Sequence, residues 1–363
     1  MNGMDLPTIR IGRRCVGAPG SVYVIAEAGV NHDGRHDHAL RLIAAAAEVG
    51  ADAVKFQCFS ADRLVTRDSP LADYQRKVGQ SRTQYEMLRR LELGRDAWTE
   101  LVREAQRCAI DFLATPFSVP DLELLVSLEV AAIKLASTDI VHGPLLDAAA
   151  RACVPVIAST GAATMEEVAM GVRRLRAGGL NELALLHCIS SYPAPERSVN
   201  LAAVAALAQT FGCVSGFSDH TQSLEMGRWA ALAGARIIEK HLTLDRSAEG
   251  PDHAFSLEPD AMKAYIRGVR QACQHLGDGR LYVSAEQEEV RRVARASLVA
   301  EHDIPVGEVL TPCVLSVKRP GGGISPMEMD RVVGLRARLP IPADTPITWN
   351  ALVPPIPQPG PAE

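Results

Sequence analysis

Two histidines stand at matching positions, at the ends of two successive strand-like segments. His220 closely follows the segment "VSGFS", and His241 ends "RIIEKH". Neighbouring strands lie about 4.8 Å apart, so both imidazoles could reach one ion. Two neutral imidazoles leave coordination positions for water and a substrate oxygen. Catalytic zinc usually has three protein ligands, and the sequence shows no evident third ligand. We therefore expect Mn²⁺, with Mg²⁺ or Co²⁺ as alternatives. A lone histidine would more often be structural, but here two histidines occupy matching positions.

Two lysines, Lys55 and Lys134, end strand-like segments that are otherwise apolar. A buried ammonium group is costly unless an anion faces it. Hydroxyl side chains stand at the ends of neighbouring segments: Thr115, Ser137, Ser159 and Ser218. Together these residues predict a cradle for a phosphate and a carboxylate. The alternative is that the lysines only pair with Glu27 and Glu239 inside the fold.

One carboxylate, Glu27, ends the first strand-like segment within "AEAGVNHDG". It can act as a general base for water if burial or a metal brings its pKa toward neutrality. A purely structural ion pair is the alternative role.

The elements that must position these residues recur with a regular spacing. Eight strand-like segments alternate with stretches long enough for a helix and a loop, which predicts a (β/α)8 TIM barrel with its chemistry at the carboxyl ends of the strands. The expected strands are Val22–Ala28, Ala53–Cys58, Asp111–Thr115, Ala132–Ala136, Pro155–Thr160, Leu183–Cys188, Val214–Ser218 and Arg236–His241. Helices are expected over His38–Gly50 and Pro259–Leu276, and a hairpin before the first strand.

The chain has 363 residues, more than the about 250 of a typical barrel, so a second domain is expected. Gly277 and Gly279 mark the break between the two. We predict a catalytic barrel over residues 1–283, a linker over 284–292, a small domain over 293–354 and a disordered tail over 355–363.

The composition excludes several classes of partner. Lysine and arginine number 38 against 43 acidic residues, a net charge of −5, which argues against nucleic acid or an anionic membrane as the main partner. No apolar run reaches the about 18 residues that span a bilayer. The eight cysteines contain no Cys-x-x-Cys pair, which is typical of a reduced, cytoplasmic protein.

Short motifs along most of the chain resemble those of the sialic acid synthase family. They occur in the family's order and run from about Tyr23 to Val353: "IAEAGVNHDG", "ADAVKFQ", "ATPFS", "IKLAS", "IASTGA", "LLHCISSYPAP", "GFSDHT", "IIEKHLTLD", "GPDHAFSLEP", "ARASLVA" and "SVKRPGGGISP". The last two resemble the family's antifreeze-like (SAF) domain. Each string is a modest signal alone, and the ordered set is specific.

The resemblance implies condensation of phosphoenolpyruvate with an N-acylated mannosamine-type hexose, giving a nonulosonic acid and phosphate. It places the metal ligands at His220 and His241 and the base at Glu27. Its implied phosphoenolpyruvate contacts are Lys55, Thr115, Lys134, Ser137, Ser159 and Ser218. Its implied sugar-side residues are Gln57, Tyr192, Asp252 and Arg319, and Asp139 and Ser190 are further expected substrate contacts. Arg319 would come from the antifreeze-like domain of the other subunit of a domain-swapped homodimer.

The sequence leaves the acceptor open. Many bacterial sialic acid synthases have Ser-Gly-Glu where this chain has Ser137, Thr138 and Asp139, and Asn where it has Ser190. We expect an N-acetylneuraminate synthase; a legionaminic acid or related nonulosonate synthase is the alternative. Less favoured are a 3-deoxy-keto-acid phosphate synthase, which would not need the second domain, and a non-catalytic carbohydrate-binding protein.

Overall fold

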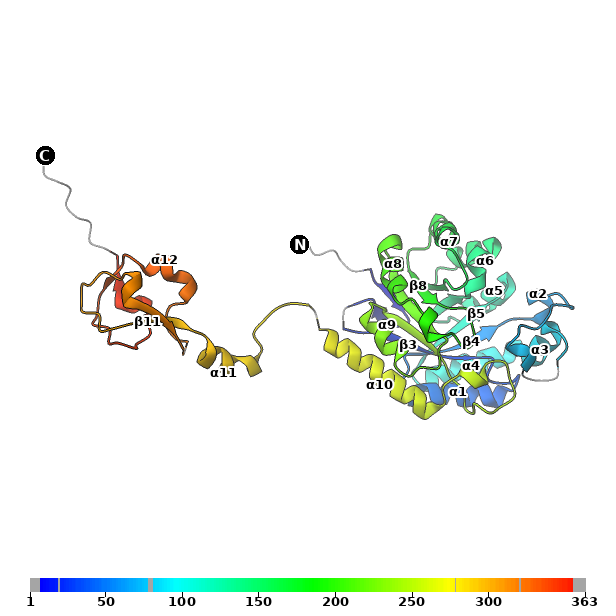
Figure 1. Ribbon diagram of the computed structural model, residues 1–363. Helices are drawn as coiled ribbons and strands as arrows, with labels where there is room; N and C mark the ends of the chain where they lie inside the picture. Colours follow the sequence, from blue (N-terminus) through cyan, green and yellow to red (C-terminus); the bar gives the residue numbers. More distant parts are fainter. Residues whose placement is uncertain (1–6, 19, 78–80, 278, 320, 355–363) are drawn as a thin grey trace. The chain divides into compact units, whose positions relative to one another are not determined.

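The computed structural model describes residues 7–18, 20–77, 81–277, 279–319 and 321–354 (Figure 1). The chain forms two compact units, which divide between Gly279 and Arg280. The tail predicted over residues 355–363 lies outside the described residues.

The first unit contains a closed barrel of eight parallel strands, as the sequence predicts. The strands follow one another around the barrel in chain order, and the last pairs with the first. They are β3 (Tyr23–Gly29), β4 (Ala53–Cys58), β5 (Asp111–Pro116), β6 (Ala132–Leu135), β7 (Val156–Ser159), β8 (Leu183–Cys188), β9 (Val214–Asp219) and β10 (Ile237–His241).

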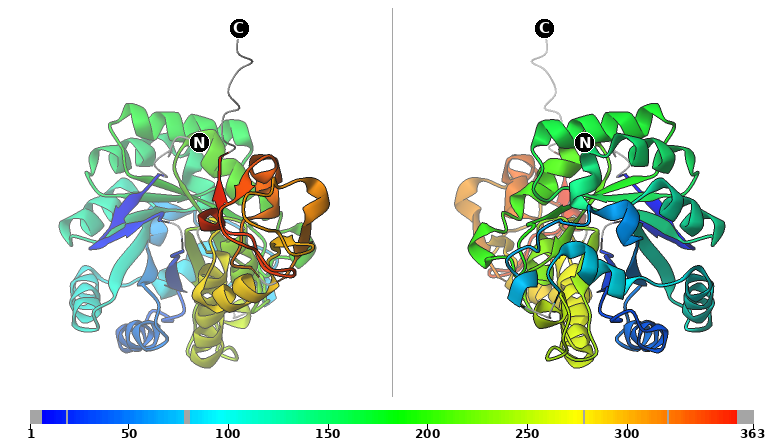
Figure 2. Two further views of the ribbon diagram at one scale, coloured as in Figure 1. Left: turned by 90° about the vertical axis from the view of Figure 1, so that its left-hand side faces the viewer. Right: turned by 90° about the vertical axis from the view of Figure 1, so that its right-hand side faces the viewer.

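Helices surround these strands (Figure 2). They are α1 (His36–Glu48), α4 (Arg95–Arg107), α5 (Val119–Ser127), α6 (Gly143–Arg151), α7 (Met165–Ala177), α8 (Ala202–Phe211), α9 (Met226–Leu232) and α10 (Pro259–Leu276). Local signals fix their starts: Thr164 and Glu167 form a capping box before α7, and Pro259 opens α10. Two further helices, α2 (Ala61–Leu64) and α3 (Gln84–Leu91), lie in the long connection between β4 and β5.

An apolar layer fills the barrel below the strand ends. Its residues include Ile25, Ala53 and Leu113, which pack with the predicted N-terminal hairpin, formed by β1 (Ile9–Ile11) and β2 (Arg14–Val16). Side chains alternate along a strand, so the residue two positions further on points to the same interior. The positions two residues after members of this layer carry Glu27, Lys55, Thr115, Lys134, Ser159 and Glu239. The fold therefore delivers these polar groups to one end of the barrel.

Strand register sets the height of these groups. Glu27 pairs with Lys55 across β3 and β4, and with His241 across β3 and β10. Gln57 pairs with Thr115 across β4 and β5. Residues that are far apart in the sequence are thus neighbours around the end of the barrel.

The second unit has its own core, made by apolar residues that include Leu298, Ile324 and Ile347. It contains the helices α11 (Ala285–Ala294) and α12 (Met329–Val332), the antiparallel pair β11 (Ser297–Ala300) and β12 (Leu315–Lys318), and the pair β13 (Arg336–Ala337) and β14 (Leu352–Val353). Most of the segment predicted as a linker, 284–292, is helical, because Ser284 and Gln287 form a capping box that starts α11. Among the described residues no helix is both long and apolar enough to cross a membrane.

A buried histidine makes the stability of the first unit depend on pH. Burial lowers the pKa of His32 to about 4, from an ordinary 6.5, so the unfolded chain binds the extra proton first as the pH falls. The free energy of unfolding should therefore drop by about 2 kcal/mol between pH 7 and pH 5 through this residue. Chemical denaturation at both pH values checks this. The His32→Asn variant, whose amide oxygen replaces the ring nitrogen that accepts from Gly34 N–H, should lose that part of the pH dependence.

Candidate active site

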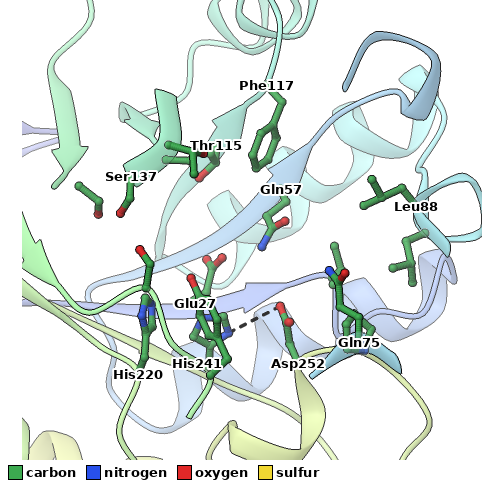
Figure 3. Close-up of a pocket in the computed structure, with 18 of the residues that line it drawn as sticks. Glu27, Gln57, Gln75, Leu88, Thr115, Phe117, Ser137, His220, His241 and Asp252 are labelled. Atoms are coloured by element: carbon green, nitrogen blue, oxygen red, sulfur yellow. Dashed lines mark ion pairs between the residues drawn. The ribbon is translucent and has the colours of Figure 1, made fainter. Parts of the chain in front are cut away.

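A pocket of about 430 Å³ opens at the carboxyl ends of the barrel strands (Figure 3). Apart from Asp139 and Arg319, every residue predicted for the site lines it. These residues are Glu27, Lys55, Gln57, Thr115, Lys134, Ser137, Ser159, Ser190, Tyr192, Ser218, His220, His241 and Asp252. The topology thus brings together residues from all eight strand ends.

Two buried lysines and two buried glutamates form the floor of the pocket. Lys55 Nζ lies 2.8 Å from Glu27 Oε2 and 3.8 Å from Glu239 Oε1, while Lys134 Nζ lies 3.6 Å from Glu239 Oε2. Lys55 donates to Thr115 Oγ1 (3.1 Å) and Lys134 donates to Ser159 Oγ (2.7 Å). The lysines therefore pair with the glutamates, as the alternative interpretation holds, and also face the pocket.

The two glutamates differ in their electrostatic surroundings. Burial raises the pKa of Glu27, and the nearby Glu239 adds to the effect despite the opposing charge of Lys55. Burial also acts to raise the pKa of Glu239, but Lys134 and Lys55 outweigh it and hold that pKa below the ordinary value. Two carboxyl groups whose pKa values are pushed apart are suited to different roles. Glu239 is suited to be the permanent counter-charge, and Glu27 to exchange a proton.

Hydroxyl groups complete one side of the pocket. Ser218 Oγ donates to Glu239 Oε1 (3.0 Å), and Ser137 Oγ accepts from Gly161 N–H (3.1 Å). A Cβ atom at Gly161 would lie 2.4 Å from Ser190 Oγ, so glycine is required for this close approach. The lysines and hydroxyls together can bind a phosphate and a carboxylate.

The two histidines lie side by side in the pocket wall, with ring centroids 5.6 Å apart (Figure 3). Burial lowers the pKa of both imidazoles, which keeps the rings neutral near pH 7. His220 Nδ1 lies 2.8 Å from the carbonyl oxygen of Ile189, so it can donate there and leave Nε2 free to accept. His241 Nδ1 is buried, has no hydrogen-bond partner among the described residues and lies 3.9 Å from Asp252 Oδ2.

These features fit a divalent metal ion bound mainly by the two histidines. Neutral rings, one oriented by a backbone carbonyl and one with an unpartnered buried nitrogen, are typical of metal ligands. Within the described part of the chain, no set of three or more His, Cys, Asp or Glu side chains is placed to hold a metal ion. A metal here would therefore keep positions for water or substrate oxygen.

The opposite end of the pocket is largely apolar, and we did not predict this apolar wall from the sequence. Figure 3 shows Leu88 and Gln75 at the end remote from Ser137. The apolar lining residues that pack together are Val30, Leu64, Met87, Leu88, Leu91 and Phe117. Val65 and the polar Gln57, Tyr74, Gln75 and Gln84 also line the pocket. The unusual length of the β4–β5 connection and the apolar spacing Met87, Leu88, Leu91 on α3 are the signals that could have revealed this wall.

Aromatic rings join this wall to the histidines. The Tyr192 ring lies 4.4 Å from the His220 ring and 5.3 Å from the Tyr74 ring. Asp252 stands beside them, and burial followed by the charge of Glu27 raises its pKa to about 7. This end of the pocket can hold a ligand with apolar and amide groups.

Asp139 and Arg319 lie outside the set that lines the pocket. Asp139 belongs to a 3₁₀ helix (Ser137–Val141), where burial raises its pKa to about 6 and Oδ2 has no hydrogen-bond partner in the described structure. Arg319 is exposed in the second unit, directly after β12. The substrate contact of Asp139 and the sugar contact of Arg319 stay predictions.

Comparison with known proteins assigns this architecture. The model of the NeuB family matches residues 42–281, and the model of the SAF domain matches residues 295–353. The chain belongs to the NeuB family. It is therefore an enzyme of the family that includes proteins named as legionaminic, pseudaminic and sialic acid synthases.

Individual NeuB relatives are similar over most of their length. The N,N'-diacetyllegionaminic acid synthase of Legionella pneumophila is 38% identical over 339 residues, covering 92% of this chain and 95% of that protein. The spore coat polysaccharide biosynthesis protein SpsE of Bacillus subtilis is 35% identical, covering 96% of this chain and 98% of that protein. The crystal structure of N-acetylneuraminic acid synthetase from Leptospira borgpetersenii has a TM-score of 0.70 at 34% identity, covering 78% of this chain and 94% of that one.

Proposed function

We propose that this NeuB enzyme condenses phosphoenolpyruvate with the aldehyde of an N-acylated mannosamine-type hexose, releasing phosphate and a nonulosonic acid. The observation that carries the proposal is one pocket that is lined both by the buried Lys55 and Lys134 and by His220 and His241. One half of this pocket suits a small dianion or trianion, and the other suits an acylated sugar.

Different residues of the chain bind phosphoenolpyruvate and activate the water. Lys55, Lys134 and the hydroxyls hold the phosphate and carboxylate of phosphoenolpyruvate, so its methylene carbon faces the aldehyde. That carbon forms the new C–C bond as the aldehyde C=O bond opens, which leaves an alkoxide on the former aldehyde oxygen and a cation at carbon two. Water adds to this cation; Glu27 accepts one proton of the water, and the alkoxide takes up a proton to become a hydroxyl. The tetrahedral intermediate then breaks its bond between carbon two and the bridging oxygen, and the remaining hydroxyl proton leaves with the phosphate to give the keto group.

We further propose a divalent cation, Mn²⁺ before Mg²⁺ or Co²⁺, held by His220 and His241. When bound, such an ion supplies a Lewis acid for the aldehyde oxygen of the acceptor. Asp252, 3.9 Å from His241 Nδ1, orients the sugar beside it. The rings of Tyr192 and Phe255 exclude water from the two histidines.

The apolar wall bears on the choice of acceptor. The sequence favours N-acetylmannosamine, the acceptor of an N-acetylneuraminate synthase. A wall of Leu88, Met87 and Phe117 suits a sugar that carries a methyl group and a second acyl group better than one with a free hydroxymethyl end. Together with similarity to legionaminic acid synthases, this feature favours a 2,4-diacetamido-2,4,6-trideoxyhexose.

A panel of acceptors tests the proposal. The purified protein with Mn²⁺ and phosphoenolpyruvate should release phosphate with one of these two sugars, and mass spectrometry should find the joined product. Phosphate release with arabinose 5-phosphate or erythrose 4-phosphate instead would establish the 3-deoxy-keto-acid phosphate synthase. No release with any sugar would favour the non-catalytic carbohydrate-binding protein.

We also propose a domain-swapped homodimer in which Arg319 of the antifreeze-like domain contacts the sugar of the other subunit. We further propose a cytoplasmic location. The eight free cysteines suit a reducing compartment. Arg319→Ala should raise the KM of the acceptor about tenfold with little change for phosphoenolpyruvate, since a charge-assisted hydrogen bond is lost. Steady-state kinetics of Arg319→Ala and of Arg338→Ala, which changes another exposed arginine of the same unit, check this. Equal kinetics for both would contradict the contact.

A further inference from the structure

The turn that follows β3 contacts the loop that carries Asp252, although the two are distant in the sequence. Asn31 Nδ2 donates to the carbonyl oxygen of Leu242 and to Ser256 Oγ, both at 2.9 Å. Ser256 Oγ in turn donates to the carbonyl oxygen of Asp252 (2.5 Å). The backbone of Asp252 is thereby tied to the turn and to the residue after His241.

A second link joins Asp33 of the same turn to His253, the neighbour of Asp252. His253 Nε2 lies 2.9 Å from Asp33 Oδ1, and its Nδ1 lies 2.6 Å from Thr243 Oγ1. An ionised carboxylate only accepts, so Nε2 carries the proton it donates to Asp33. Nδ1 shares a hydrogen bond with Thr243 Oγ1, whose hydroxyl also lies 3.1 Å from the carbonyl oxygen of Asp245. Both ring nitrogens are therefore engaged, and the ring is 2% exposed.

Close packing leaves little freedom at this contact. A Cβ atom at Gly250 would lie 2.5 Å from His253 Cδ2 and 3.1 Å from Asp33 Oδ1. Gly34, with φ of +70°, would bring a Cβ atom to 2.1 Å from the carbonyl oxygen of Arg90, at the end of α3. The turn thus contacts both the Asp252 loop and the helix that supplies the apolar wall.

Neither Asp33 nor His253 lines the pocket, whereas Asp252 does and lies beside His241 (Figure 3). Asp252 directly precedes His253 in the chain, so it is the pocket residue that the pair can most directly position. We propose that the Asp33–His253 pair is a positioning clamp that fixes the Asp252 carboxylate for binding of the acceptor sugar. The proposal rests on the proposed function, because it assigns Asp252 to the acceptor half of the pocket.

The clamp should act on one substrate and spare the other. Asp33 and His253 belong to the loops after β3 and β10. Lys134 and Ser159 lie in β6 and β7, and Ser137 follows β6, on another part of the barrel. A loosened Asp252 should therefore weaken the acceptor and leave the phosphoenolpyruvate cradle intact. A general loss of stability would lower activity without this separation.

Asp33→Gly is the sharpest probe, because Asp33 has φ of +58°, which glycine adopts without strain. With N-acetylmannosamine or the diacetamido-trideoxyhexose, whichever gives product, the acceptor KM should rise about tenfold. The KM of phosphoenolpyruvate should stay within about twofold. Asp33→Asn, whose amide oxygen can still accept from His253, should recover most of the loss. Asp37→Ala, which removes an exposed carboxylate four residues further on, should match the wild type.

A crystal structure of the Asp33→Gly variant gives a readout that does not depend on turnover. It should show the Asp252 side chain displaced from its position beside His241, with Lys55 and Lys134 unmoved. An unmoved Asp252, an unchanged acceptor KM, or an equal rise in both KM values would overturn the clamp. A wild-type protein inactive on every acceptor would refute the proposed function instead, and the crystal structure would still decide whether the pair positions Asp252.

Discussion

We expect Glu27→Gln to lower kcat on the order of a thousandfold and to leave the binding of Mn²⁺ and phosphoenolpyruvate intact. Glutamine cannot take a proton from water, but its amide oxygen can still accept from Lys55 Nζ, now 2.8 Å from Glu27 Oε2. Burial raises the pKa of Glu27, which brings the carboxylate closer to the proton affinity a base needs near neutral pH. Steady-state kinetics and isothermal titration with each ligand measure the two effects separately.

Glu48→Gln is a matched control for this variant. Glu48→Gln is the same substitution at the exposed end of α1, and Glu48 is not among the residues that line the pocket. It should keep wild-type kcat. Full activity of Glu27→Gln, or equal losses in both variants, would remove Glu27 from the reaction and leave it as the ion-pair partner that the sequence also allowed.

Lys134→Met should lower kcat/KM for phosphoenolpyruvate by about two to three orders of magnitude. Burial lowers the pKa of Lys134, and a bound anion would offset that by stabilising the ammonium form. Methionine keeps the length of the side chain but removes the charge that faces the substrate. Glu239 keeps its contacts with Lys55 and Ser218, so two partners of the buried carboxylate remain.

The matched control here is Lys263→Met, on the exposed side of α10. Stabilisation by phosphoenolpyruvate, measured as the shift in Tm on adding it, should disappear in Lys134→Met and persist in Lys263→Met. A normal Tm shift in Lys134→Met would show that the anion binds elsewhere in the molecule.

Much of the fold follows from local sequence patterns. Every predicted barrel strand overlaps the observed one, because β-rich apolar runs end at a polar residue, and α10 has the predicted bounds Pro259–Leu276. The period of two along each strand also explains why Lys55 and Lys134 share an interior with Ile25 and Leu113. A closed barrel converts that local alternation into one convergent site.

The remaining features depend on contacts that no local pattern encodes. The pairing of Asp33 with His253 spans 220 residues, and two polar residues in separate loops carry no periodicity that relates them. The apolar wall arises because α3 lies over the pocket, although its sequence resembles that of any amphipathic surface helix. The opposite pKa directions of Glu27 and Glu239 depend on the placement of both lysines, which only coordinates give.

Manganese binding followed by electron paramagnetic resonance tests the central claim, that two imidazoles and two ammonium groups serve one ion and one anion in one pocket. The wild type should bind Mn²⁺, and phosphoenolpyruvate should change the spectrum of the bound ion. His220→Ala and His241→Ala should each lose that binding, while His275→Ala, on the exposed end of α10, should keep it. Equally tight Mn²⁺ binding in all variants, or a Mn²⁺ spectrum that does not change when phosphoenolpyruvate is added, would contradict the claim.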